Sequence, residues 1–422
     1  MIQVPEDERN VGIECYATRG PPCPARTKAS AEDFMVEEEI SQQGLITQEQ
    51  EGYFPLYRVQ KRSIDTMHMA QELAFALGSK VSYGGLKDKR AVAVQYVTPT
   101  SRRSARPSEV VREHFIASLI GYVPRPISRG AVAGNKFVVT LRGCCLEIEK
   151  RIGEAMELAE ARRLPNFYGL QRFGTSGAGT HLIGGALVRR EFEKAVNLML
   201  LSVDPSNPER GRRARDAMAA GRYDEGISLL PPGRDVEKRV ARVLSRHPGE
   251  WIRALRGTSL RLRRLYVQAY QSLIFNRTLS RAIEEGVDVS TLQEGDNWAE
   301  ASEDALVTSV VRGVRDPPTQ RAVPMVQLVG YAYRDYGSRF DALIKKILEE
   351  EGVTPGQFYV KEMQEISSEG GFRRPHMVVR DPTWSVADGT AKLGFTLAKG
   401  QYATVLLREI IKPRDSTGSG IG

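Results

Sequence analysis

The chain has 422 residues, of which 41% are hydrophobic and 27% charged, and its formal net charge is +8. This composition is typical of a globular protein and excludes a disordered chain, and the length predicts two domains rather than one. No apolar run reaches the roughly 20 residues that span a bilayer, and the acidic N-terminus is unlike a signal peptide, so we expect a cytoplasmic protein with no membrane partner.

The chain lacks the spacings that usually mark metal sites and familiar cofactor chemistry. Its four cysteines form no CxxC pair, and its five histidines show no HxxxH or HExxH spacing. The glycine-containing run at residues 174–180 matches neither a phosphate loop nor a dinucleotide-binding turn, so we interpret it as a flexible connection. Kinase and nucleophile-elbow motifs are also missing. The sequence therefore predicts no metal site.

Hydrophobic patterns predict both strands and helices in the first part of the chain. The best-defined helix is Thr66–Leu77, because Asp65 is a good N-cap and Gly78 is a typical helix stop. The other elements expected there are strands at Ala31–Ile40, Tyr53–Gln60, Val81–Tyr83, Val92–Val97 and Lys136–Arg142, and a helix at Leu146–Arg162.

Helices become frequent after Gly185, and strand-like segments return near the C-terminus. The expected helices are Arg190–Leu201, Arg234–Leu244 and Ser259–Glu285. The expected strands are His376–Arg380, Gly394–Leu397 and Tyr402–Leu407. We therefore predict an α+β fold in which strands from both ends of the chain pair into one sheet, with the middle inserted as a helix-rich domain.

Positive charge is concentrated in one stretch of the chain. Between Pro205 and Arg264 there are 15 Lys and Arg against 7 Asp and Glu, an excess of 8 that accounts for the whole net charge. Such arginines either solvate helix faces or attract a polyanion. Because charges balance elsewhere and not here, we favour contact with nucleic acid, with Arg212, Arg213 and Arg215 as candidate contacts.

The densest candidate for chemistry is the segment Gly84–Tyr96, with the sequence GGLKDKRAVAVQY. It places Asp88 in a glycine-rich turn that requires unusual backbone dihedrals or close approach by a ligand. The flanking basic residues, Lys87, Lys89 and Arg90, favour the ionised carboxylate that a nucleophile or general base needs. The alternative is a hairpin turn with surface salt bridges of little energetic value.

A second candidate is Pro165–Gly174, with the sequence PNFYGLQRFG. Aromatic side chains beside an arginine can stack on an unpaired base and hold a phosphate. Aromatic residues also form hydrophobic cores, so this segment taken alone leaves both interpretations open.

Taken together, the motifs resemble those of the TruD family of pseudouridine synthases. Gly85–Ala91 followed by Gln95 is similar to the catalytic motif of the family. Further similar segments, in the same order along the chain, are Glu32–Glu38, Gly134–Phe137, Leu141–Arg142, Asn166–Gly174, Gln271–Asn276 and Phe395–Glu409. The long insert resembles archaeal members more than the compact bacterial ones.

The resemblance implies a fold and a division of the chain. A pseudouridine-synthase catalytic domain with a mostly antiparallel sheet is expected from residues 1–188 and 369–422. Residues 189–368 would form the inserted, helix-rich α/β TRUD domain, which provides the other wall of an RNA-binding cleft. This arrangement agrees with the charge pattern, since the basic excess lies in the insert.

The resemblance also implies roles for individual residues. Asp88 matches the catalytic aspartate, whose carboxylate attacks the target uridine at the base or at the sugar C1′. Asn166 would position the catalytic loop, Tyr168 would stack on the flipped base, and Phe395 would line the base pocket. Two basic neighbours are expected to pair with Asp88 or with the RNA phosphate, without a ranking between them: Lys87 and Arg172.

The expected substrate of such an enzyme is tRNA, with uridine 13 in the D-arm as the usual target of the family. The isomerisation changes no oxidation state and hydrolyses no bond, so no metal or cofactor is expected, and no obligatory protein partner is evident. The competing hypothesis is a non-catalytic RNA-binding protein, such as a tRNA folding chaperone. The presence of Asp88 argues against that hypothesis.

Overall fold

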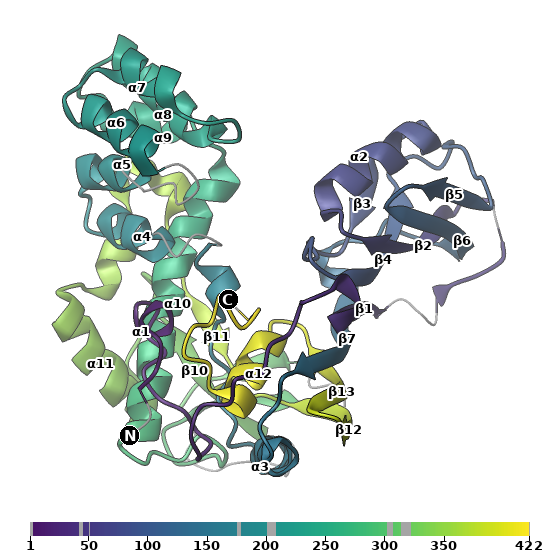
Figure 1. The fold of residues 1–422 in the computed structure, drawn as a ribbon. Helices are drawn as coiled ribbons and strands as arrows, with labels where there is room; N and C mark the ends of the chain where they lie inside the picture. Colours follow the sequence, from purple (N-terminus) through teal and green to yellow (C-terminus); the bar gives the residue numbers. More distant parts are fainter. Residues whose placement is uncertain are drawn as a thin grey trace.

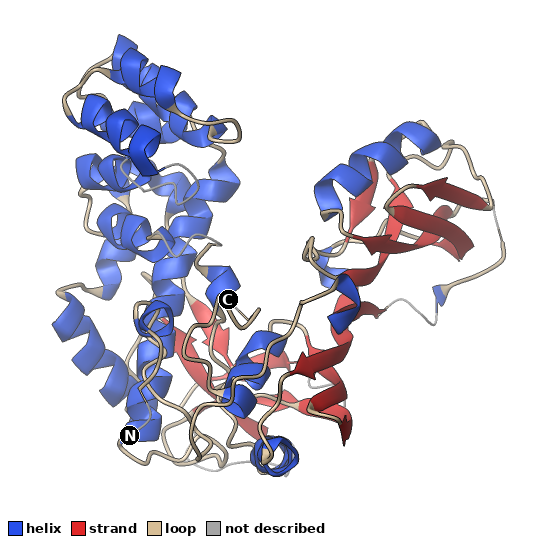
Figure 2. Cartoon of the chain, viewed as in Figure 1, coloured by secondary structure: helices blue, strands red, loops and turns tan. Residues whose placement is uncertain are grey.

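The computed structural model describes residues 3–41, 45–49, 51–174, 179–200, 208–301, 307–313 and 322–421. Its ribbon is V-shaped, with two arms that rise from a common base (Figure 1). Figure 2 shows helices gathered in one arm, and strands in the other arm and in the base. Within the described residues, no helix combines the length and the apolar character needed to cross a membrane.

One large sheet extends from the base into the strand-rich arm, in the order β12-β13-β7-β1-β4-β2-β6-β5, with β3 paired to β4. Its strands are β1 (Phe34–Ile40), β2 (Phe54–Arg62), β3 (Val81–Tyr83), β4 (Val92–Pro99), β5 (Glu109–Arg112), β6 (Phe115–Val123), β7 (Val132–Arg142), β12 (Val379–Ala387) and β13 (Thr390–Ala398). Only the β1–β4 pair is parallel among these strand pairs. Because β13 pairs with β7, the two ends of the chain share this sheet, as predicted.

Helix α2 (Thr66–Leu77) covers one face of the sheet in the strand-rich arm. It begins and ends where the sequence predicts. The Asp65 carboxylate accepts hydrogen bonds from two backbone amides of the first turn, and Gly78 ends the helix in the left-handed conformation with φ of 60°. Its buried Met69 and Leu73 belong to one hydrophobic cluster with Val59 of β2, so apolar packing fixes the helix to the sheet.

The helical arm contains α4 (Thr180–Val188), α5 (Phe192–Leu200), α6 (Pro208–Ala219), α7 (Tyr223–Leu229), α8 (Asp235–Arg246), α9 (Trp251–Arg256), α10 (Leu260–Glu284) and α11 (Arg339–Glu351). A small sheet in the order β11-β10-β8-β9 adjoins them, formed by β8 (Asn297–Ala301), β9 (Val307–Val311), β10 (Ala322–Leu328) and β11 (Gly371–Arg373). Helix α10 is the longest helix of this arm and packs against α4 and α11. A Cβ on Gly184 of α4 would lie 2.0 Å from the Tyr266 carbonyl oxygen, so the two helices pack backbone to backbone.

The remaining helices, α1 (Glu6–Arg9), α3 (Ile148–Glu160) and α12 (Ala403–Ile411), lie at the base. A buried ion pair joins the two ends of the chain there, because Arg408 Nε lies 2.8 Å from Glu8 Oε2 and each side chain is only 2% exposed. Burial opposes the guanidinium charge, yet the pKa of Arg408 is raised, since Glu8 and Glu409 outweigh it. The ionic contact therefore holds α12 against the N-terminal segment.

The prediction of a strand at Tyr402–Leu407 is wrong, because these residues begin helix α12. All nine residues of α12 are buried. Tyr402–Leu407 is a short run of mostly apolar and β-favouring residues, and periodicity cannot tell so short a run in a strand from one in a buried helix. The mixed composition and the mostly antiparallel sheet otherwise agree with the predicted α+β class.

Candidate active site

A cavity of roughly 180 Å³ forms where segments from distant parts of the chain meet at the base of the strand-rich arm. Its lining residues are Phe34, Val36, Leu86, Lys87, Asp88, Asn135, Phe137, Gln171, Gln401, Tyr402, Ala403 and Thr404. They come from β1, the loop after β3, β7, the segment after α3, and the start of α12. Asp88 supplies the carboxylate of this lining, and Phe34, Phe137 and Tyr402 supply three aromatic rings.

Asp88 is reached by a cation that the sequence motifs did not indicate. The Lys28 ammonium lies 2.9 Å from Asp88 Oδ2, and the two side chains are 11% and 48% exposed. The same ammonium lies 4.6 Å from the centre of the Phe34 ring, another lining residue. A charge-assisted hydrogen bond of this kind favours the ionised carboxylate and fixes its orientation. The partners are 60 positions apart, so no local pattern links them.

The two glycines before Asp88 allow close packing rather than unusual backbone angles. Neither Gly84 nor Gly85 has a positive φ. A Cβ on Gly84 would lie 2.1 Å from Val132 Cγ2 of β7, which no side chain tolerates. The loop that carries Asp88 therefore packs closely against the sheet at Gly84. The close approach that this glycine allows is to Val132 of the protein and not to a ligand.

The Lys87 side chain contacts Glu38 and Asn135 and not Asp88. Its ammonium lies 3.0 Å from Glu38 Oε1 and donates to Asn135 Oδ1 over 2.5 Å. The Glu38 side chain is completely buried. Lys87 therefore does not pair with Asp88 here, because the buried carboxylate of Glu38 holds the lysine, and its pairing with a phosphate stays a prediction.

Asn166 and Tyr168 lie one layer behind the cavity. Asn166 is buried, donates to the Arg374 carbonyl and accepts a hydrogen bond of 2.7 Å from the Arg373 guanidinium. That guanidinium lies 4.0 Å from the centre of the Tyr168 ring. Tyr168 in turn meets Tyr402 edge to face, with ring centres 6.3 Å apart. Of these two tyrosines, Tyr402 has the ring that lines the cavity.

Phe395 and Arg172 are also removed from direct contact with Asp88. Phe395 is 1% exposed and stacks on Phe137, with ring centres 5.3 Å apart and an interplanar angle of 25°. Of the two stacked rings, that of Phe137 lines the cavity. Arg172 lies over Tyr168 and donates to Gln268 of α10 over 3.1 Å, so it joins the cavity wall to the helical arm.

The candidate RNA-binding arginines lie on α6, at the far end of the helical arm (Figure 1). Arg212 and Arg213 are exposed. Arg215 is half-buried, and its Nε donates to the Gly211 carbonyl over 3.3 Å. The three arginines are therefore not equivalent, since within the part of the chain that the structure describes Arg215 has a hydrogen-bond partner and the other two have none.

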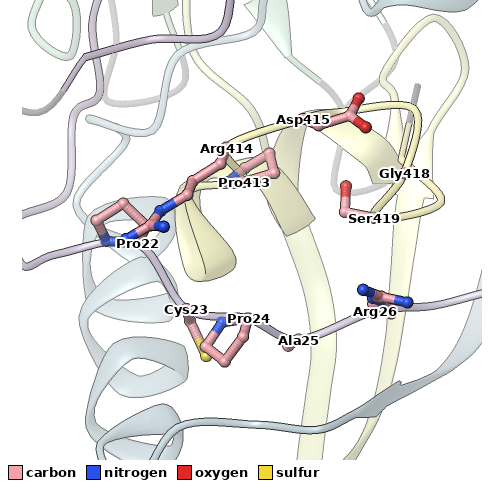
Figure 3. A pocket seen from close by; sticks show the side chains of 10 residues that line it. All are labelled: Pro22, Cys23, Pro24, Ala25, Arg26, Pro413, Arg414, Asp415, Gly418 and Ser419. Atoms are coloured by element: carbon pink, nitrogen blue, oxygen red, sulfur yellow. The ribbon is translucent and has the colours of Figure 1, made fainter.

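A larger cavity of roughly 500 Å³ lies between residues 22–26 and the C-terminal tail, residues 413–419, which face each other across it (Figure 3). The tail supports the candidate site from behind. The Ser419 carbonyl accepts from Thr27, the residue before Lys28, and the Ile421 carbonyl accepts from the Gln171 side chain. The larger cavity therefore lies beside the contact between the C-terminal tail and the segment that leads to Lys28. Asp88 and the aromatic rings line the smaller cavity instead.

Comparison with known proteins shows which family the chain is similar to. The sequence model of tRNA pseudouridine synthase D (TruD) matches residues 10–410.

The chain belongs to the TruD family.

Relatives and a solved structure agree along nearly the whole length of the chain. A protein named probable tRNA pseudouridine synthase D from Pyrobaculum neutrophilum is 32% identical over 98% of each chain. Its namesake from Archaeoglobus fulgidus is 33% identical, over 96% of this chain and 99% of its own. The crystal structure described as TruD from Methanosarcina mazei superposes with a TM-score of 0.80 at 27% identity, over 98% of this chain and 99% of its own. The predicted family and fold are thus confirmed.

Proposed function

We propose that this protein isomerises uridine 13 in the D-arm of tRNA to pseudouridine, with Asp88 as the nucleophile. The observation that carries the proposal is the position of Asp88 in the cavity, paired with the Lys28 ammonium at 2.9 Å and surrounded by aromatic rings. Membership of a family of tRNA pseudouridine synthases supplies the reaction class.

The reaction needs one nucleophile and a site for one unstacked base. The carboxylate of Asp88 attacks the uridine at the base or at C1′ of the sugar, and the bond between N1 and C1′ breaks. The base then rotates, C5 bonds to C1′, and the bond between the uridine and the Asp88 carboxylate breaks, which regenerates the free enzyme. The proton on C5 is lost and N1 gains one, so the product is an isomer. Because no oxidation and no hydrolysis take place, the proposed step requires no cofactor.

The aromatic rings provide the surface for the extruded base. An enzyme that acts on a base in folded RNA must take it out of the stack, and a ring face compensates the lost stacking. Phe137 and Tyr402 line the cavity and can offer such faces. We propose that Phe395, Tyr168 and Asn166 act indirectly, by supporting the residues that line the cavity. Phe395 backs Phe137, and Asn166 holds the Arg373 guanidinium against Tyr168.

The direct test is incubation with unmodified tRNA in buffer containing EDTA, followed by carbodiimide labelling and primer extension to map pseudouridine. We expect a new stop in the D-arm with the wild-type protein. Asp88→Asn keeps the shape of the side chain and removes the nucleophile, so it should abolish the stop while RNA binding persists. Intact binding without any stop in wild type would instead support an RNA-binding chaperone, and turnover by Asp88→Asn near the wild-type rate would refute the role of Asp88.

A further inference from the structure

A buried lysine lies directly beneath the loop that carries Asp88. Lys61 of β2 is 0% exposed. Its ammonium donates three hydrogen bonds to backbone carbonyls, at 2.7 Å to Ile64, 2.9 Å to Asp88 and 3.3 Å to Lys87. Each proton of the ammonium therefore has an acceptor, and two of the three acceptors belong to the catalytic loop. A lysine that merely filled space would not be buried with every proton bonded and two of the three directed at one turn.

A second buried group also forms a hydrogen bond with this turn. The Thr66 hydroxyl, at the first residue of α2, accepts a hydrogen bond of 2.9 Å from the Lys87 amide and donates one of 3.0 Å to Gln95 Oε1. Thr66 and Gln95 are buried. The backbone of the turn is thus fixed through both a carbonyl and an amide of Lys87, by groups that do not line the cavity.

We propose that Lys61 is a positioning residue for the isomerisation: its ammonium, together with Thr66, fixes the backbone at Lys87 and Asp88 and thereby places the Asp88 carboxylate. This inference rests on the function proposed above. The Asp88 side chain is itself 48% exposed, and among the described residues the ion pair with Lys28 is the one side-chain bond that restrains it, so the rest of its placement comes from its backbone. Displacement of a reacting group by about 1 Å can cost on the order of 100-fold in rate.

The charge of Lys61 depends on pH in an accessible range. Burial lowers the pKa of Lys61 to about 8, against the opposing pull of Asp88 and Asp65. Lys87 is the other charged group that acts on it. The flanking positions on β4 and β6, Ala93 and Phe115, are uncharged. The ammonium with three donors exists below that pKa, so its contribution to placement is lost as the pH rises through it.

The test compares Lys61→Met with a control variant on the same strand. Lys61→Met keeps the length of the side chain and removes the charge and all three donors. Val59→Ala shortens a fully buried residue of β2 in the hydrophobic cluster that includes Met69 and Leu73 of α2, and its apolar side chain can give no hydrogen bond to the turn. Both variants should unfold at lower temperature. We expect kcat to fall by about 100-fold in Lys61→Met with KM for tRNA within about threefold, and kcat to stay within about threefold of wild type in Val59→Ala.

The pH profile gives a readout that a structural role would not change. Wild-type kcat should decline above about pH 8, roughly tenfold per unit, and this descending limb should be missing in Lys61→Met. Equal losses of kcat in Lys61→Met and Val59→Ala, or the same descending limb in Lys61→Met and wild type, would overturn the proposal.

Hydrogen exchange separates this proposal from the function on which it rests, because it needs no turnover. Amides of residues 84–91 should exchange at least about tenfold faster in Lys61→Met than in Val59→Ala. If Lys61→Met does not fold, Thr66→Val removes the second support and should show the same acceleration with a smaller loss of kcat. Unchanged exchange in the turn would refute the positioning role even if wild type forms pseudouridine. Inactive wild type with accelerated exchange in Lys61→Met would refute only the proposed reaction.

Discussion

The Lys28 ammonium lies 2.9 Å from the Asp88 carboxylate, although 60 positions separate the two residues in the chain. Lys28→Met should lower kcat by about 100-fold, because the carboxylate loses both its orienting bond and its compensating charge. Lys89→Met is the matched control, since this exposed lysine is next to Asp88 in sequence and has no ion-pair partner among the described residues. Single-turnover rates on unmodified tRNA would measure both. Equal losses in the two variants would mean that net charge matters and the ion pair does not.

Tyr402 and Tyr168 compete for the role of stacking on the base. The Tyr402 ring lines the cavity, and Tyr168 meets that ring from behind. Because stacking of a base on an aromatic ring contributes about 1–3 kcal/mol, Tyr402→Ala should lower kcat/KM by about 5- to 150-fold. Tyr402→Phe keeps the ring face and should stay near wild type. A larger loss in Tyr168→Ala than in Tyr402→Ala would return the stacking role to Tyr168.

Local signals in the sequence were enough to predict some elements residue by residue. Helix α2 has the predicted bounds because its start and stop depend on Asp65 and Gly78, which act on their own neighbours. The shared sheet of the two chain ends followed from the strand patterns and the order of the motifs, and the β7–β13 pairing confirms it.

Tertiary contacts could not be predicted in the same way. The pairing of Lys28 with Asp88 joins distant segments and leaves no pattern in either. Lys87, adjacent to Asp88 in sequence, points instead to the buried Glu38. Tyr402–Leu407, at the start of helix α12, was mistaken for a strand because so short an apolar run is compatible with either element. In each case the missing information concerns which groups a side chain meets in the folded chain.

Two buried histidines should make the protein sensitive to mild acid. Burial lowers the pKa of His376 to about 3 and that of His181 to about 4. The unfolded chain binds protons at histidine near its ordinary pKa of about 6.5, whereas the native state does not, so stability falls as pH falls below that value. The loss is about 1.4 kcal/mol per pH unit for each histidine, until the pH reaches the native pKa.

Urea unfolding between about pH 6 and about pH 4.5 would measure this slope. His376→Gln cannot titrate, so its slope should be smaller than that of wild type by the share of one histidine. His114→Gln is the control, because His114 is exposed and should leave the slope unchanged. A slope in His376→Gln equal to that of wild type would show that the buried ring is protonated at no cost.

The basic excess between Pro205 and Arg264 should act through Arg212 and Arg213. Both are exposed on α6 and have no ion-pair partner among the described residues, whereas Arg210 of the same helix donates to the Ser228 carbonyl over 3.1 Å. Each phosphate contact that is lost reduces the slope of log K against log salt by about 0.7–0.9. Arg212→Gln with Arg213→Gln should therefore weaken tRNA binding and flatten its salt dependence by about 1 to 2.

Binding should be measured over a salt series in the Asp88→Asn background, so that turnover does not alter the RNA. Arg210→Gln is the matched control on the same helix and should change the slope by less. An unchanged slope in the double variant would mean that this face of α6 is turned away from the RNA. The exposed arginines of α8, Arg239 and Arg242, would then be the next contacts to test, because they carry the same charge on a neighbouring helix of the same arm.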